Sequence, residues 1–291
     1  MWLRLALVCS LGLVACGEER PVHRPAPPSS APPTTTVEPE APAPRDVTFT
    51  TSDGVTIAAT LARGARVDAP AVVLVHQVSS TRAEWAPLIA RLHADASLTT
   101  LAIDMRGHGE STHGPNGTTL DWGQFDDAAW AATRLDVLAA LAFLVGPESG
   151  ASPPSFAVIG SSIGSSAVIA AAAEDVRLAT IVTISPGRAY HGFDAITPAA
   201  SLGDRAILAV ASRDEEDSVQ TAETYGRITS TPPVIVEGDA HGVLILASQP
   251  SALDHVEDFV RERLQWVRVN ARPAAVARPP LTSTGVPAPT H

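Results

Sequence analysis

Cysteine is almost absent from this chain of 291 residues, which contains only Cys9 and Cys16. Both lie close to the start, so the rest of the sequence holds no thiol. This distribution excludes a disulfide framework, a cysteine-based metal site and a cysteine nucleophile from the main part of the chain.

Lysine is missing altogether, and the 20 basic residues are all arginines. Ser-Lys dyads, Schiff-base chemistry and a Walker A phosphate loop each need a lysine, so these are excluded. The formal net charge is −11 without any basic run, which argues against nucleic acid as a partner. Neither a G-x-G-x-x-G motif nor zinc-ligand spacing around His108 or His113 is present, so we expect no metal and no other cofactor.

The apolar run at the start of the chain is short. Arg4 precedes an apolar stretch, Leu5–Val14, that is too short for a transmembrane helix. The stretch ends in "LVACG", which resembles the lipobox of bacterial lipoproteins. The resemblance implies a signal peptide over residues 1–15 and a lipid on Cys16 that anchors the protein to a bacterial membrane, in the cell envelope and facing the periplasm or the exterior. An ordinary secretory signal with an incidental cysteine is the alternative.

Proline-rich segments flank the central part of the chain. Residues 16–45 and 272–291 are rich in Pro, Ala, Ser and Thr and show no hydrophobic period. We therefore expect a disordered tether and a disordered tail. Residues 46–271 between them are enough for a single domain with a sizeable core.

Within residues 46–271, short apolar runs alternate with helical patterns. A strand pair around the turn Ser52–Gly54 comes first. Further buried strands are expected at 71–76, 99–104, 156–160, 178–185, 205–212 and 233–238. Helices are expected at 85–92, 126–145, 161–174, 217–228 and 251–267. The alternation predicts an α/β fold with a mostly parallel, doubly wound sheet, helices on both faces, and the chemistry at the carboxyl ends of the strands.

One such strand end carries the sequence Gly160-Ser161-Ser162-Ile163-Gly164, directly before an alanine-rich helix. A nucleophile on a tight strand–helix turn needs very small residues two positions before and after it, because the two backbones nearly collide there. The helix N-terminus also favours developing negative charge. A chance match in a chain rich in small residues is the alternative, but the partners further along the chain favour a nucleophile at Ser162.

Among nine histidines, His241 has the position of a general base. It lies in "GDAHG", just beyond an apolar strand and between small residues. The other histidines lie in the terminal segments, in expected helices, or at earlier strand ends.

The acid is expected in the sequence "SRDEED", which offers four carboxylates after a strand. Asp214 lies two residues beyond the strand end at Ser212, which suits a group that shares an edge with Ser162. Asp217 precedes Gln220 by three residues, as in a helix capping box. Glu215 and Glu216 are expected to be solvated.

Taken together, the order of these motifs resembles the α/β-hydrolase fold. "VLVHQ", "IDMRGHGEST", "GSSIG", "VASRDEED" and "GDAHG" stand in the family's order, and the His-Gln pair and short loops are most similar to the dienelactone-hydrolase-like esterases. The resemblance implies a triad of Ser162, Asp214 and His241. It also implies an oxyanion hole made by the N–H groups of Ile163 and Val78.

Two departures from the family's pattern concern substrate binding. Gln77 stands where the family has a glycine, so we expect a different turn there or a contact between its amide and the substrate. The segment between Ser185 and Arg205 is too short for a large cap domain. Within it, Tyr190 and His191 are expected either to line the pocket mouth or to pack on the core.

The sequence therefore predicts a lipid-anchored serine hydrolase that cleaves a small carboxylic ester or lactone. A peptidase or an acyltransferase with the same triad is an alternative, because a fold alone does not choose the chemistry. A non-catalytic envelope protein that uses the hydrolase fold for binding is another. The sequence indicates no oligomeric state.

Overall fold

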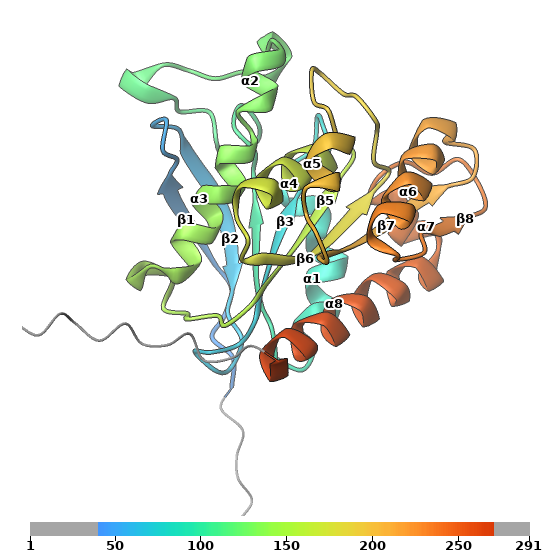
Figure 1. Cartoon of the computed structure of the whole chain (residues 1–291). Helices are drawn as coiled ribbons and strands as arrows, with labels where there is room; N and C mark the ends of the chain where they lie inside the picture. Colours follow the sequence, from blue (N-terminus) through green and yellow to red (C-terminus); the bar gives the residue numbers. More distant parts are fainter. Residues whose placement is uncertain (1–39, 271–291) are drawn as a thin grey trace, which may run out of the picture. The chain divides into compact units, whose positions relative to one another are not determined.

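A single eight-stranded sheet forms the centre of the computed structural model, which describes residues 40–270 (Figure 1). The strand order is β1-β2-β4-β3-β5-β6-β7-β8. β2 is antiparallel to both of its neighbours, whereas the pairs from β4 to β8 are parallel. The strands are β1 (Arg45–Thr50), β2 (Thr56–Ala62), β3 (Ala71–Val75), β4 (Thr99–Ile103), β5 (Phe156–Ser161), β6 (Leu178–Ile184), β7 (Ala206–Ser212) and β8 (Val234–Val236).

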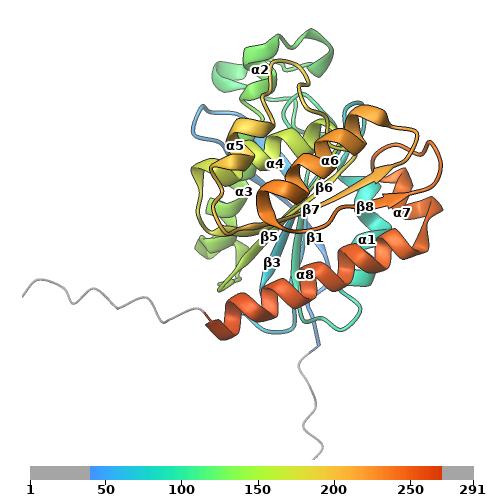
Figure 2. The same cartoon turned by 45° about the vertical axis from the view of Figure 1, so that its right-hand side comes forward.

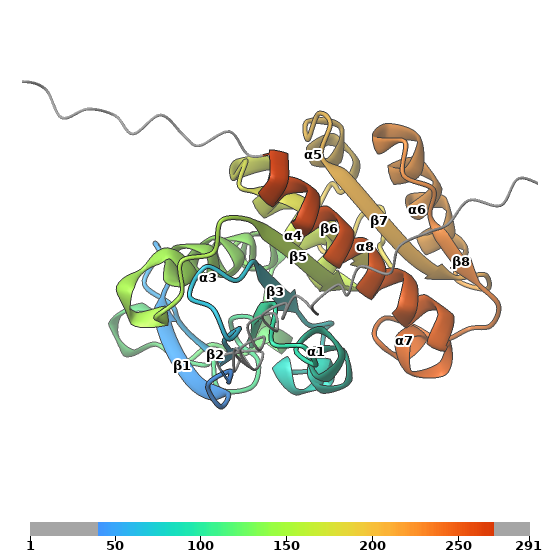
Figure 3. The same ribbon diagram turned by 90° about the horizontal axis from the view of Figure 1, so that it is seen from below.

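Helices cover both faces of this sheet, as Figures 2 and 3 show from two further directions. α3, α4, α5 and α6 pack on one face, and α1, α7 and α8 pack on the other. The helices are α1 (Ala86–Leu92), α2 (Asp127–Ala131), α3 (Arg134–Val145), α4 (Ile163–Glu174), α5 (Ile196–Ala200), α6 (Glu216–Thr229), α7 (Leu244–Ser248) and α8 (Pro250–Asn270). This arrangement confirms the predicted doubly wound α/β fold.

The uninterrupted apolar strands are explained by these two helical layers. In β3, Val73 and Val75 face the layer of α3 and α4, while Val72 and Leu74 face the layer of α1 and α8. All four side chains are completely buried. Because side chains alternate between the faces of a strand, a strand buried on both faces shows no polar positions.

The expected helix at 126–145 is broken into α2 and α3. Thr133 lies at the break, where its hydroxyl donates to the carbonyl oxygen of Trp130 at 2.7 Å. Such a bond competes with the regular helical ladder and bends a helix. The stretch Asp127–Val145 is long and apolar enough to cross a membrane, but α3 packs against β1, β3 and α4, as expected for a core helix.

Two loops rise side by side above the carboxyl edge of the sheet (Figures 1 and 2). One is the long connection from β4 to α3, which includes α2, and the other connects β6 to α5. They meet where the ring of Trp130 stacks on that of His191, with centroids 4.8 Å apart. The connection after β6 carries only the five-residue helix α5, so the prediction of no large cap domain is confirmed. The excursion after β4 was not predicted.

The predicted signal peptide over residues 1–15 and Cys16 lie outside the described residues. So do most of the tether and the whole of the tail. These segments stay predictions from the sequence.

Candidate active site

Ser162 lies on a strained turn between β5 and α4. Its φ of 51° and ψ of −118° place a non-glycine residue in a sparsely populated region. The flanking glycines are needed sterically: a Cβ at Gly160 would overlap the carbonyl group of Gly164, and a Cβ at Gly164 would overlap the carbonyl groups at the end of β3. The strain persists because the turn is held from both sides, with the N–H of Ser162 donating to the carbonyl oxygen of Ile184 at 2.8 Å.

The hydroxyl of Ser162 faces the imidazole of His241. The distance from Oγ to Nε2 is 2.9 Å, and Nδ1 of the same ring is hydrogen-bonded to Oε1 of Glu215. If the Nδ1 proton is donated to the carboxylate, Nε2 is left to accept the proton of the hydroxyl. Only 6% of Ser162 is exposed, whereas 45% of the His241 side chain is. A serine, an imidazole and a carboxylate thus form one chain of hydrogen bonds that reaches the surface on the imidazole side.

The carboxylate in this chain belongs to Glu215 and not to Asp214, which corrects the expectation from the sequence. Beyond the end of β7, the N–H of Asp214 donates to the carbonyl oxygen of Gly238 at 3.1 Å, so the backbone continues outward beside β8 and Asp214 is exposed. A turn then closes, with the N–H of Glu215 donating to the carbonyl oxygen of Ser212 at 3.0 Å. This turn returns Glu215 over the strand end, where its longer side chain meets His241.

Glu215 was expected to be solvated, but only 14% of its side chain is exposed. Burial by itself raises the pKa of this carboxyl group, and hydrogen bonds from His241 and Ser185 more than offset that, so the pKa lies below its ordinary value of 4.5. The group is therefore a carboxylate at neutral pH.

The capping box expected at Asp217 is also wrong, because α6 already begins at Glu216.

The two expected oxyanion donors lie in suitable segments. Ile163 is the first residue of α4, so its N–H has no acceptor inside the helix. Val78 follows β3 in the loop that precedes α1, and Ser79 beside it has a φ of 55°. The turn at this point therefore uses a left-handed residue, although glycine is absent.

Gln77 is bound within the protein at both its backbone and its side chain. Its N–H donates to Glu84 at 3.1 Å, and its carbonyl oxygen accepts from Nδ1 of His76 at 2.6 Å. The side-chain oxygen accepts from the hydroxyl of Ser161 at 3.3 Å. A Cβ at Gly242 would overlap that same oxygen. The amide of Gln77 thus packs against Gly242 in the loop that carries His241, and a contact with the substrate stays a prediction.

Burial shifts the pKa of two groups that contact Gln77, the imidazole of His76 and the carboxyl group of Glu84. It lowers the pKa of His76 to about 4, and the ring stays neutral because its Nε2 accepts the N–H of Met105 at 3.0 Å. It raises the pKa of Glu84 to about 7. Both effects follow from the cost of a charge in a poorly solvated place.

Tyr190 and His191 lie in the loop after β6 and have different surroundings. Tyr190 is half-buried, folded over Gly187, and near enough to the carboxylates of Asp217 and Glu215 for them to raise its pKa in addition to burial. His191 is exposed and stacks on Trp130. Tyr190 therefore borders the Glu215 side of the site, and His191 joins the two loops above the sheet edge.

The loop after β4 is held by arginine–carboxylate clusters. Arg106 donates to Asp136 from its N–H and its Nε, at 2.9 and 2.8 Å, and to both oxygens of Asp53, at 2.7 and 3.1 Å. Arg82 pairs with Asp104, whose oxygens also accept the N–H groups of Arg82 at 2.7 Å and Glu110 at 2.9 Å.

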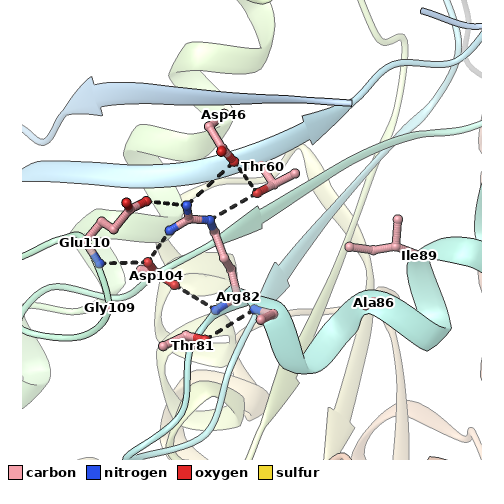
Figure 4. A pocket seen from close by; sticks show the side chains of 10 residues that line it. Asp46, Thr60, Thr81, Arg82, Ala86, Ile89, Asp104, Gly109 and Glu110 are labelled. Atoms are coloured by element: carbon pink, nitrogen blue, oxygen red, sulfur yellow. Dashed lines mark hydrogen bonds and ion pairs between the residues drawn. The ribbon is translucent and has the colours of Figure 1, made fainter. Parts of the chain in front are cut away.

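Figure 4 shows the Arg82 cluster beside a cavity of about 490 Å³. Three carboxylates surround the guanidinium in this view, those of Asp46, Asp104 and Glu110. The cavity therefore offers no free cation to an anionic ligand. Within residues 40–270, no three His, Cys, Asp or Glu side chains gather in a way that could hold a metal ion.

Three polar residues near the site were given no role from the sequence. Ser185 bonds to Glu215 at 2.7 Å, Ser212 donates to the carbonyl oxygen of Ala240 at 2.5 Å, and Glu84 binds the backbone of Gln77. Ser185 and Ser212 each end a strand or follow it directly, which is the one signal that the sequence offered.

The fold, the strained serine turn and the Ser-His-Glu chain define an α/β hydrolase. A model described as the alpha/beta hydrolase family matches residues 72–289, and the chain belongs to this family. The comparison with curated protein sequences gives no significant match.

Solved structures of similar fold include an esterase, a dienelactone hydrolase and a further alpha/beta hydrolase. An esterase of Pyrococcus furiosus is 17% identical, with a TM-score of 0.59, and the alignment covers 76% of this chain and 91% of that one. A dienelactone hydrolase from Anabaena variabilis is 18% identical, with a TM-score of 0.55 and coverages of 78% and 98%. An alpha/beta hydrolase from a Penicillium species is 15% identical, with a TM-score of 0.60 and coverages of 77% and 99%. At these identities the similarity shows the fold.

Proposed function

We propose that this protein is a serine hydrolase that cleaves small carboxylic esters or lactones, with Ser162 as nucleophile, His241 as base and Glu215 as acid. The observation that carries the proposal is the hydrogen-bond chain itself, with Oγ of Ser162 2.9 Å from Nε2 of His241 and Nδ1 bound to Glu215. A nucleophile, a base and a group that orients the base are what acyl transfer by a serine requires. The similarity in fold to an esterase and to a dienelactone hydrolase supports an ester or lactone as the substrate.

The reaction follows from these positions. Oγ of Ser162 attacks the carbonyl carbon while Nε2 of His241 takes the hydroxyl proton, and Glu215 stabilises the resulting imidazolium. The N–H groups of Ile163 and Val78 donate to the oxyanion. The intermediate then collapses, and the leaving alcohol takes the proton from His241. Water, deprotonated by His241, attacks the acyl-enzyme, and the acid is released as Ser162 regains its proton.

A fluorophosphonate probe tests this proposal directly, because it labels only an activated serine. We expect the wild-type protein and Asp214→Asn to be labelled at Ser162, and Ser162→Ala to remain unlabelled. Turnover of p-nitrophenyl acetate and of a simple lactone, compared on the same samples with turnover of a peptide p-nitroanilide, separates an esterase from a peptidase. A folded wild-type protein that is neither labelled nor active would contradict the proposal and favour a non-catalytic binding protein.

We further propose that the mature protein is anchored to a membrane of the bacterial envelope through a lipid on Cys16. The support is the sequence "LVACG" after a short apolar run, and both lie outside the described residues. Two or more acyl chains anchor a protein stably, whereas one alone holds it weakly.

The anchor is tested by expressing the full chain and Cys16→Ser in a bacterium and separating membranes from soluble material. We expect the wild-type protein to pellet with membranes and Cys16→Ser to be released by a high-salt wash. Cys9→Ser is the matched control, and it should behave as the wild type. Pelleting of Cys16→Ser after the wash would rule out this anchor.

A further inference from the structure

Ser185 follows β6 directly, between the loop that carries Glu215 and the loop that carries His241. It is completely buried, and its φ of 49° lies in the left-handed region. A non-glycine residue adopts this conformation only when the surroundings impose it. Its N–H donates to the carbonyl oxygen of Val210 at 2.8 Å, so the strained residue is attached to β7. Glycine would adopt this backbone conformation more easily, which points to a role for the hydroxyl group.

The hydroxyl of Ser185 connects the two loops through two hydrogen bonds. It donates to Oε2 of Glu215 at 2.7 Å, and it accepts the N–H of Gly242 at 2.8 Å. Because a backbone N–H can only donate, the hydroxyl proton must point at the carboxylate. Oε2 thereby accepts the hydroxyl of Ser185 at 2.7 Å and, more weakly, the N–H of Ser212 at 3.3 Å, while Oε1 of the same group binds His241.

A second serine holds the other side of His241. Ser212, the last residue of β7, donates its hydroxyl to the carbonyl oxygen of Ala240 at 2.5 Å. The peptide groups on both sides of His241 are therefore bound by buried serine hydroxyls. Of the two serines, Ser185 is the one whose side chain also binds the carboxylate of Glu215.

We propose that Ser185 is a positioning residue of the hydrolytic site: its hydroxyl fixes the carboxylate of Glu215 and the backbone of Gly242 together, so that the imidazole of His241 stays aligned with Ser162. The kinetic consequence rests on the proposed function, but the alignment is a property of the folded chain and can be measured without turnover. A small misplacement of a base or its partner is enough to slow catalysis strongly.

The kinetic test uses Ser185→Ala and Ser185→Gly. Both lose the hydroxyl, but glycine also removes the backbone strain. We expect kcat for p-nitrophenyl acetate to fall about 10- to 100-fold in both variants, with KM within about threefold of the wild type. The glycine variant should melt at the higher temperature of the two. A loss of kcat that followed melting temperature, with Ser185→Gly active as the wild type, would show that the role is only structural.

A double-mutant cycle shows whether Ser185 acts through Glu215. In the background of Glu215→Gln, we expect Ser185→Ala to lower kcat by less than about threefold further, because the carboxylate that it positions is already gone. In the background of Asp214→Asn, the full 10- to 100-fold loss (about the same as in the wild type) should remain. Equal losses in both backgrounds would overturn the proposal.

Proton NMR provides a readout that needs no activity. The Nδ1–H of His241, held between the ring and Glu215, should give a low-field resonance in the wild type that is absent from Glu215→Gln. We expect Ser185→Ala to lose or broaden this resonance, and an unchanged resonance would overturn the proposal. A wild-type protein that shows the resonance but cleaves no ester would contradict the proposed function instead, and the effect of Ser185→Ala on the resonance would still decide the positioning role.

Discussion

Two groups of polar side chains lie at the carboxyl edge of this sheet, the ion pairs around Arg106 and the hydrogen bonds that join Glu215, His241 and Ser162. They differ in whether every member is paired. Around Arg106, the guanidinium is neutralised by Asp136 and Asp53, and the carboxyl group of Asp136 is completely buried. The hydrogen bonds from Glu215 through His241 end on the hydroxyl of Ser162, which carries no charge that a further partner would have to neutralise. The first group satisfies its members and holds a loop in place.

The second group, Glu215, His241 and Ser162, leaves the hydroxyl of Ser162 available for chemistry. This difference explains why the Asp-x-Arg-Gly-His-Gly stretch, although rich in charged residues, belongs to the scaffold. It also predicts that changes in the two groups affect different measurements. Variants in the Ser-His-Glu chain should change turnover and leave stability nearly intact, and variants in the arginine clusters should do the reverse.

The largest effect is expected from Ser162→Ala. Turnover of p-nitrophenyl acetate should fall at least about 10⁴-fold, because no other group can form the acyl-enzyme. The melting temperature should be unchanged or slightly higher, since alanine loses no packing there. Ser166→Ala is the matched control, as it removes a buried hydroxyl without a partner from the next turn of α4. Equal activity in the two variants would remove Ser162 from the mechanism.

Glu215→Gln should have the next largest effect. The amide keeps the shape of the side chain but no longer stabilises an imidazolium, so turnover should fall roughly 10²- to 10⁴-fold. Asp214→Asn, one residue away and exposed, should keep turnover within about twofold of the wild type, as exposed groups without a role do. The comparison is made by steady-state kinetics at pH 7.5, and the reverse outcome would return the acid to Asp214.

Asp136→Asn should change stability and spare the chemistry. Removing one partner of a buried ion pair typically costs about 3–5 kcal/mol, because the other charge stays buried. We expect urea denaturation to show a loss of about 3 kcal/mol, with turnover per folded molecule unchanged. Glu237→Gln is the control, since its pair with Arg213 is exposed and should contribute less than about 1 kcal/mol. An equal loss of unfolding free energy in Asp136→Asn and Glu237→Gln would show that the buried ion pair contributes no more to stability than the exposed one.

Glu84→Gln should change the pH dependence of stability, by a smaller amount. Because burial raises the pKa of Glu84 from 4.5 to about 7, the folded state binds more protons than the unfolded state between these values. The contribution of Glu84 to stability therefore falls as pH rises through this window. Glutamine cannot ionise, so the variant should gain roughly 1–2 kcal/mol relative to the wild type between pH 5 and pH 8.

The readout for Glu84 is the difference between the two unfolding curves. His76 contributes with the opposite sign in an overlapping window, because its pKa of about 4 is below its ordinary value of 6.5. Its protonation destabilises the folded state as pH falls, in wild type and variant alike. Parallel curves for wild type and Glu84→Gln would mean that Glu84 is ionised throughout.

The turn that carries Ser162 could be predicted from the sequence because part of its steric requirement is local. Gly160 is required by its close contact with the carbonyl group of Gly164, four residues further on, and such a local contact leaves a pattern in the sequence. The apolar strands could be predicted for a similar reason, because burial on both faces leaves no polar position along them.

The acid could not be identified in the same way. Whether Asp214 or Glu215 meets His241 depends on a turn that is held by the neighbouring strand β8, through the bond from Asp214 to Gly238. The break at Thr133 is a second case, because a threonine inside an apolar helical pattern is compatible with a straight helix or with a bent one. For the acid, a contact between distant segments decides between two local conformations that the sequence allows equally.

The contact between Gln77 and Gly242 has a consequence for how this chain can change over evolutionary time. Because the side chain of one residue occupies the space that a Cβ of the other would need, the two positions are epistatic. A side chain at 242 would have to displace the amide of Gln77 and the hydroxyl of Ser161, and it would also be strained by the φ of 59°. A glycine at 77 would remove the amide that packs against Gly242. In descendants of this chain, a change at position 77 is therefore expected to precede any change at position 242.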